Sequence, residues 1–138
     1  MKYLNVNNER EICELSEIIK TESFSLALAH VLEFFNTNKA ELMKACCLDP
    51  SCIYKYLEYK AMPTKRTLIL ICIVAGWPAQ VSYSLLYTAG FVLNSSATDM
   101  FFDDLLQNSK KTDIYQVNKL IEEHNKSAGR IVVPLFKM

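Results

Sequence analysis

Residues 36–68 read NTNKAELMKACCLDPSCIYKYLEYKAMPTKRTL, and this stretch decides the fold. Asn38 is a residue type that caps helices, and Glu41 stands three positions later, as in a capping box. Asp49 is a second cap, and it is followed by Pro50 at the first helical position, where the missing N–H of proline does no harm. The stretch therefore predicts two short helices in close succession.

These two helices are expected over Lys39–Cys46 and Pro50–Glu58, with a turn of about three residues between them. A short helix, a tight turn and a second helix that opens with small polar residues form the helix-turn-helix arrangement. In that arrangement the second helix lies in the DNA major groove, and the first helix crosses the backbone. The apolar residues of the two helices are spaced so that the helices can pack together, and these residues are Leu42, Ala45, Leu48 and Ile53. The next helix supplies the surface on which they pack, with Leu68, Ile71 and Cys72.

The same part of the chain, roughly residues 23–75, resembles the Xre/Cro family of phage and bacterial repressors. The resemblance is carried by residues 39–45 (KAELMKA), residues 48–56 (LDPSCIYKY), and Pro63-Thr64 with Thr67-Leu68. Residues 89–118 are similar to a helical extension that follows such domains in mobile-element proteins. The resemblance implies a lambda-repressor-like helix-turn-helix bundle with a C-terminal helical extension. It also implies a sequence-specific transcriptional regulator of phage or mobile-element type that binds double-stranded DNA.

Three places depart from the pattern of the family. Cys47 stands where the family usually has glycine, because the turn needs a positive φ angle, and a non-glycine residue there costs about 1 kcal/mol. Met43 stands where a small residue usually lets the two helices approach closely. At the start of the second helix the family often has Arg or Gln, which read base edges in pairs, whereas this chain has Pro50, Ser51 and Cys52.

The residues expected to face DNA lie on and around the second helix. Lys39 is expected to contact phosphate, Ser51 and Lys55 to contact bases or phosphate, and the later cations to contact the DNA backbone. The complete set of candidate DNA-binding residues is Lys39, Pro50, Ser51, Cys52, Tyr54, Lys55, Lys60, Lys65 and Arg66. Residues 39–66 hold six basic and three acidic side chains, a net charge of plus three. Four or five phosphate contacts would give a log–log salt slope of about −4.

Hydrophobic periodicity predicts helices almost throughout the remaining chain. These helices are expected over Asn8–Lys20, Ser23–Phe35, Lys65–Ala75, Gln80–Ala89, Thr98–Gln107 and Thr112–His124. Thr64 is expected to cap the helix over Lys65–Ala75. The apolar run Leu68–Ala75 is far shorter than the roughly 20 residues of a membrane span, so it predicts a buried helix. Only Arg130–Phe136, with its β-branched residues, predicts one short terminal strand. The fold class is therefore all-α, with a helix-turn-helix domain over residues 1–76 and a helical extension over residues 77–138.

The composition fits a small cytoplasmic protein without enzymatic chemistry. The 138 residues are 51% apolar and carry 15 basic and 15 acidic side chains, which excludes a uniformly basic nucleic-acid binder. Three scattered glycines make no phosphate-binding loop, and no cofactor is expected. The polar start, Met1–Arg10, has no secretory signal pattern, and no membrane association is expected. The five cysteines are expected to be reduced thiols: Cys13, Cys46, Cys47, Cys52 and Cys72. Among them, Cys46, Cys47 and Cys52 match no zinc spacing and are expected to pack structurally.

Two functions remain open at this point. The first is a dimeric DNA-binding regulator that dimerises through the helices after Gly76 or through the tail, where Ile131, Val133 and Leu135 alternate. The second is a protein-interaction module derived from a helix-turn-helix, such as an antitoxin or an anti-CRISPR-type inhibitor of host defence, with a host protein as its partner. One exposed basic face would favour the first function. An exposed patch around Tyr54 and Tyr59 would favour the second, whereas Tyr56 is expected to pack inward.

Overall fold

The computed structural model describes residues 9–138, and this part of the chain is all-helical, which confirms the predicted fold class. The helices are α1 (Glu9–Ile19), α2 (Phe24–Phe34), α3 (Lys39–Ala45), α4 (Ser51–Leu57), α5 (Lys65–Ala75), α6 (Ala79–Thr88), α7 (Ala97–Asn108) and α8 (Ile114–Ala128). The predicted start of the first helix at Asn8 lies outside the described residues. Among the described helices, none has both the length and the apolar character that crossing a membrane requires.

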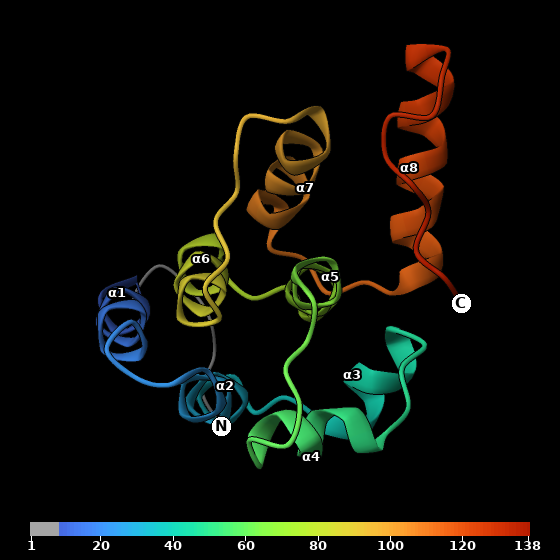
Figure 1. Ribbon diagram of the computed structural model, residues 1–138. Helices are drawn as coiled ribbons and strands as arrows, with labels where there is room; N and C mark the ends of the chain where they lie inside the picture. Colours follow the sequence, from blue (N-terminus) through green and yellow to red (C-terminus); the bar gives the residue numbers. More distant parts are fainter. Residues whose placement is uncertain (1–8) are drawn as a thin grey trace.

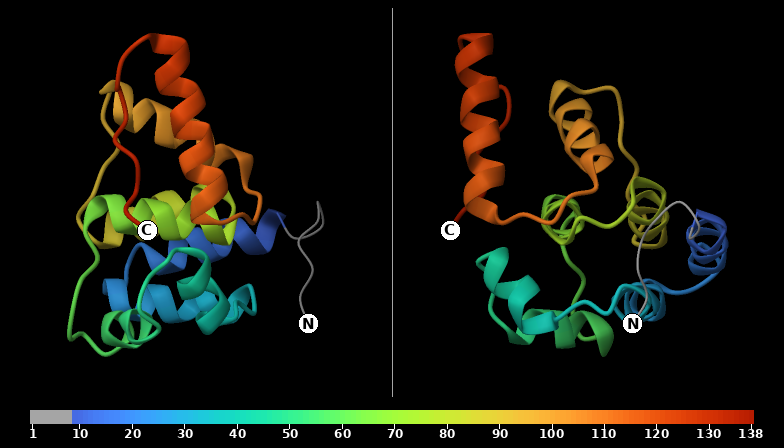
Figure 2. Two further views of the ribbon diagram at one scale, coloured as in Figure 1. Left: turned by 90° about the vertical axis from the view of Figure 1, so that its right-hand side faces the viewer. Right: turned by 180° about the vertical axis from the view of Figure 1, so that it is seen from behind.

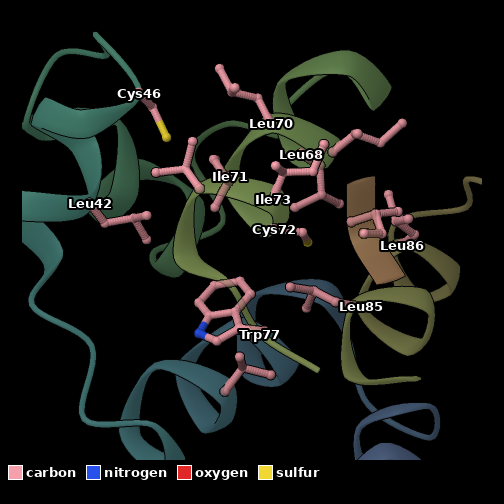
Figure 3. Packing of buried hydrophobic residues seen from close by; sticks show 14 of the residues in the cluster. Leu42, Cys46, Leu68, Leu70, Ile71, Cys72, Ile73, Trp77, Leu85 and Leu86 are labelled. Atoms are coloured by element: carbon pink, nitrogen blue, oxygen red, sulfur yellow. The ribbon is translucent and has the colours of Figure 1, made fainter. Parts of the chain in front are cut away.

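Helix α5 lies at the centre of the molecule, with the other helices arranged around it (Figures 1 and 2). Residues 68–74 of α5 are all buried, which confirms that the apolar run is a buried helix. Helices α3 and α6 supply Leu42, Cys46, Leu85 and Leu86 to the same core, beside Trp77 (Figure 3). Helix α6 packs against both α1 and α2, so the helix that follows Gly76 shares its core with the N-terminal helices.

Side-chain caps define where several helices begin. Asn38 caps α3 and Thr64 caps α5, because each side-chain oxygen accepts a hydrogen bond from the N–H three residues later, at 2.9 and 3.2 Å. Both caps are confirmed predictions. Helices α7 and α8 begin after Ser96 and Asp113, whose side chains cap them in the same way.

Gly76 ends α5 at a point where another segment passes very close. Its φ is +71°, in the left-handed region, and a Cβ there would lie 2.3 Å from the N atom of Lys111 and 2.6 Å from the carbonyl carbon of Lys110. The N–H of Thr112 donates to the carbonyl oxygen of Val74 at 3.0 Å. The loop between α7 and α8 is thereby held against the end of α5, and only glycine fits at this contact.

The segment after α8 is not a strand, so the prediction of a short strand over Arg130–Phe136 is wrong. Asn125 of α8 accepts hydrogen bonds at its Oδ1 from the N–H groups of Val132 and Val133, at 2.9 and 3.0 Å. Its Nδ2 donates to the carbonyl oxygen of Val133 at 2.8 Å. Because a side-chain amide satisfies these main-chain groups, the segment needs no neighbouring strand, and it runs back along α8 (Figure 2).

A second asparagine of α8 holds the tail further along. Asn118 accepts a hydrogen bond from the N–H of Phe136 at 2.8 Å and donates to its carbonyl oxygen at 3.0 Å. We refer to Asn118 and Asn125 as the asparagine clamps. Between them Val133 is fully buried, whereas Ile131 and Leu135 are exposed. The three alternating residues of the tail therefore do not all face solvent.

Candidate nucleic-acid interface

Helix α4 is anchored by one face and open on the other. Ile53 and Tyr56 are buried, which confirms that Tyr56 packs inward, and the hydroxyl of Ser25 in α2 donates to the carbonyl oxygen of Tyr56 at 2.5 Å. Tyr54 and Lys55 point to solvent on the opposite face. An anchored helix with a free outer face can be inserted rigidly into a groove of a partner.

The turn between α3 and α4 has the backbone conformation that the sequence predicts. Cys47 has a φ of +54°, so the positive angle expected at this position is confirmed. The turn closes through main-chain hydrogen bonds from Cys47 to the carbonyl oxygen of Lys44, at 3.0 Å, and from Leu48 to that of Met43, at 2.9 Å. The Met43 side chain is fully buried. The Cys47 thiol lies 3.8 Å from the Tyr115 hydroxyl, so the start of α8 covers this turn.

Asp49 and Ser51 form the start of α4. The Oδ1 atom of Asp49 accepts hydrogen bonds from the N–H of Ser51 at 2.8 Å and from its hydroxyl at 2.6 Å, which confirms Asp49 as the cap. These two hydrogen bonds hold the pKa of Asp49 below its usual value, so the carboxylate is charged at neutral pH. Pro50 already has helical backbone angles. The Ser51 hydroxyl uses its proton internally, so it can accept a hydrogen bond from a base but cannot donate one to a phosphate.

Two of the candidate DNA-binding cations bind partners within the protein itself. The ammonium group of Lys65 lies 2.7 Å from Asp99 Oδ2, a carboxylate at the start of α7 that is almost fully buried. The guanidinium of Arg66 stacks on the ring of Phe136 at 4.3 Å, and it donates to the carbonyl oxygen of Pro134 at 2.9 Å. Lys65 and Arg66 thus fasten α7 and the tail to the start of α5. Neither residue is therefore assigned a contact with DNA.

The remaining candidates form a smaller basic surface. Lys39 and Lys55 make no ion pair with another described residue, and Lys60 pairs with Glu58 at 3.2 Å on the exposed side of α4. Asp99 neutralises the charge of Lys65, so the net charge of plus three over residues 39–66 falls to plus two (three minus one). Arg66 keeps its charge, because its partners are a neutral carbonyl oxygen and an aromatic ring. Pro50 is exposed, and Cys52 is half-buried. Electrostatic attraction to DNA is therefore weaker than the charge count of the sequence indicates.

Three large side chains on and after α4 are exposed to solvent. The exposed fractions are 51% for Tyr54, 69% for Tyr59 and 54% for Met62. Tyr59 also has a left-handed backbone, with φ +63°, and its hydroxyl lies 2.8 Å from the Ser23 hydroxyl at the start of α2. Spacing along α4 indicates that the tyrosines of this helix cannot share one face. The exposure of Met62, in the loop after α4, has no signal in the sequence.

The five cysteines differ in their environments. Cys46 and Cys72 are buried, which confirms packing for these two, and burial raises the pKa of both thiols to about 12. Cys52 is half-buried. Cys47 is exposed, so the prediction that it packs is wrong, and Cys13 is exposed as well. All five are free thiols, and among residues 9–138 no three His, Cys, Asp or Glu side chains gather as metal ligands would.

Comparison of the chain with protein-family models, with curated proteins and with solved structures found no match.

Proposed function

We propose that this protein is a sequence-specific DNA-binding transcriptional regulator of phage or mobile-element type, without catalytic activity or cofactor, that acts in the cytoplasm. The proposal places the outer face of α4 in the major groove of a two-fold DNA site, bound by a homodimer. The observation that carries it is the α3–α4 unit, in which a left-handed Cys47 closes a tight turn before a helix with an anchored inner face and an exposed outer face. A tight turn between two short helices, the second of which has a free outer face, supports a helix-turn-helix.

The structure supports a specific division of roles within this interface. Lys39, Lys55 and Lys60 contact phosphates, while Ser51 and Tyr54 face the base edges. Three phosphate contacts per protomer give a log–log salt slope of about −2.7, and a dimer about twice that value. Asp49 opposes this attraction, because its carboxylate lies at the end of α4 that points to DNA. The specific affinity therefore depends more on base contacts than on charge.

Fluorescence anisotropy tests the proposal directly. DNA from upstream of the coding region is compared with a scrambled duplex of the same length, over a series of salt concentrations. We expect tighter binding to the upstream DNA, and the replacement Lys55→Ala weakens binding to both duplexes about equally, because a phosphate contact carries no sequence information. Lys119→Ala is the matched control, since Lys119 is an exposed lysine on α8. Binding no tighter than millimolar at physiological salt would refute the regulator.

A second function is favoured by the exposed side chains of Tyr54, Tyr59 and Met62. If the chain is a protein-interaction module, such as an antitoxin or an anti-CRISPR-type inhibitor, these side chains form the centre of the contact with a host protein. The low net charge around α4 suits that role better than it suits phosphate contacts. One variant distinguishes the two functions. Tyr59→Ser is expected to abolish binding of a protein partner, and it leaves the phosphate contacts of a DNA complex intact.

A further inference from the structure

A groove opens on the side of the molecule formed by α1, α6, α7 and the loop between α6 and α7. Its volume is about 980 Å³, near the upper end of the range for small-molecule sites. Tyr83, Tyr87 and Phe91 contribute rings to its lining, and Leu86 and Leu93 contribute apolar side chains. Helices α3 and α4 lie on another side of α5 (Figure 1), so the groove is separate from the proposed DNA interface.

The charges that line the groove leave one carboxylate without a cationic partner. Lys20 lies 3.3 Å from Glu17, and these two charges offset each other. Asp103 accepts hydrogen bonds from the Tyr83 hydroxyl and from the Gln107 side-chain amide, and both donors are neutral. Within residues 9–138 no Lys, Arg or His forms an ion pair with Asp103. The groove thus presents aromatic rings together with a single uncompensated negative charge.

A buried hydroxyl in the same groove has no hydrogen-bond partner. Ser16 on α1 is only 3% exposed, it lines the groove, and its Oγ makes no hydrogen bond with any described group. An unpaired buried hydroxyl destabilises the fold unless a water or a ligand satisfies it. Such a group commonly marks a site that is completed by a bound molecule.

We propose that the groove binds a small aromatic amine that carries a second polar group. The ammonium of the ligand pairs with Asp103, and its ring lies among Tyr83, Tyr87 and Phe91, where the aromatic faces also attract a cation. The second polar group of the ligand hydrogen-bonds to the Ser16 hydroxyl. Burial and the hydrogen bond to Asp103 raise the pKa of Tyr83, so its phenol stays protonated and continues to orient the carboxylate.

The test titrates tyramine, an aromatic ammonium with a phenol, into the isotope-labelled full chain and follows amide resonances by NMR at pH 7. We expect saturable shifts at residues 16–17 and 83–93. Ethylphenol lacks the ammonium and is expected to bind about tenfold more weakly, because a hydrogen bond to a charged group is lost. Shifts confined to other parts of the molecule, or equal binding of ethylphenol and tyramine, would overturn the proposal.

Variants separate recognition from mere support of the fold. Asp103→Asn is expected to weaken tyramine binding about tenfold, and Asp104→Asn, which removes the neighbouring exposed carboxylate, leaves it within about twofold. Ser16→Ala is expected to weaken tyramine but not phenethylamine, which has no phenol. Equal losses for the two ligands would mean that Ser16 only supports the groove, and an unchanged affinity of Asp103→Asn would refute the site. None of these measurements uses DNA, so they stand whether or not the protein is a regulator.

Discussion

Replacement of Gly76 by alanine tests the close contact between the end of α5 and the loop before α8. The left-handed conformation costs an alanine about 1–2 kcal/mol, and the smaller entropy of the unfolded alanine chain returns about 0.5–1 kcal/mol of this. The new Cβ would in addition lie 2.3 Å from the main-chain N atom of Lys111, which is much shorter than a van der Waals contact. Overpacking of this kind costs a further 1–3 kcal/mol or so. The expected loss in the free energy of unfolding is about 1–4.5 kcal/mol, with a midpoint of about 3 kcal/mol.

The chain contains two matched controls for this experiment. Gly90 and Gly129 also have left-handed angles, φ +84° and +73°, but a Cβ at either position would meet no atom within 4 Å. Gly90→Ala and Gly129→Ala should therefore lose only about 1 kcal/mol, the conformational part. Urea unfolding with an unchanged slope measures all three variants. If Gly76→Ala is no less stable than Gly90→Ala, the loop does not pass over the end of α5 as described.

Three further predictions concern the turn, the tail and the pair at the start of α5. Cys47→Gly should raise the free energy of unfolding by up to about 1 kcal/mol, because glycine adopts φ +54° without strain, and no gain in urea unfolding would contradict the strained turn. Asn125→Ala removes three hydrogen bonds to the tail and should lower stability by about 2–4 kcal/mol; unchanged hydrogen exchange at the Val133 amide would refute this role. Although burial raises the pKa of Asp99, hydrogen bonds from Lys65 and from the Asn94 main chain bring it below its usual value of 3.8. The pair therefore stabilises the fold above that pH and loses this effect as the pH falls through the lower pKa. In Lys65→Gln the free energy of unfolding should therefore depend less steeply on pH in this acidic range.

The features that the sequence predicts correctly are those that depend on neighbouring residues. The caps at Asn38 and Thr64 join side chains to main-chain groups three residues away, so their signal lies within one helical turn. The positive φ of Cys47 is expected from the resemblance, because the family usually has glycine at this place in the turn. The burial of residues 68–74 follows from their continuous apolar character.

The local pattern is incomplete where distant residues supply the partners of a side chain or of the main chain. Lys65 and Arg66 look like a basic pair at the start of a helix, but their partners lie 34 residues away at Asp99 and 68 residues away at Pro134. No local pattern encodes those contacts. The β-branched residues of the tail predict a strand. This prediction fails because the main-chain groups of the tail bind the side chains of Asn118 and Asn125 and not a second strand.

The asparagine clamps determine which positions of the chain can vary during evolution. Asn118 and Asn125 bind only main-chain atoms of the tail, so they specify the path of this segment without specifying the identity of the residues along it. In a library of random single substitutions selected for folding, the two asparagines should tolerate almost no replacement. Exposed Ile131 and Leu135 should accept most residue types. The exposed positions of the tail would then diverge in composition, whereas the buried Val133 and Phe136 would stay apolar. Part of the invariant signal for the docking of the tail would be found on α8 and not on the tail itself.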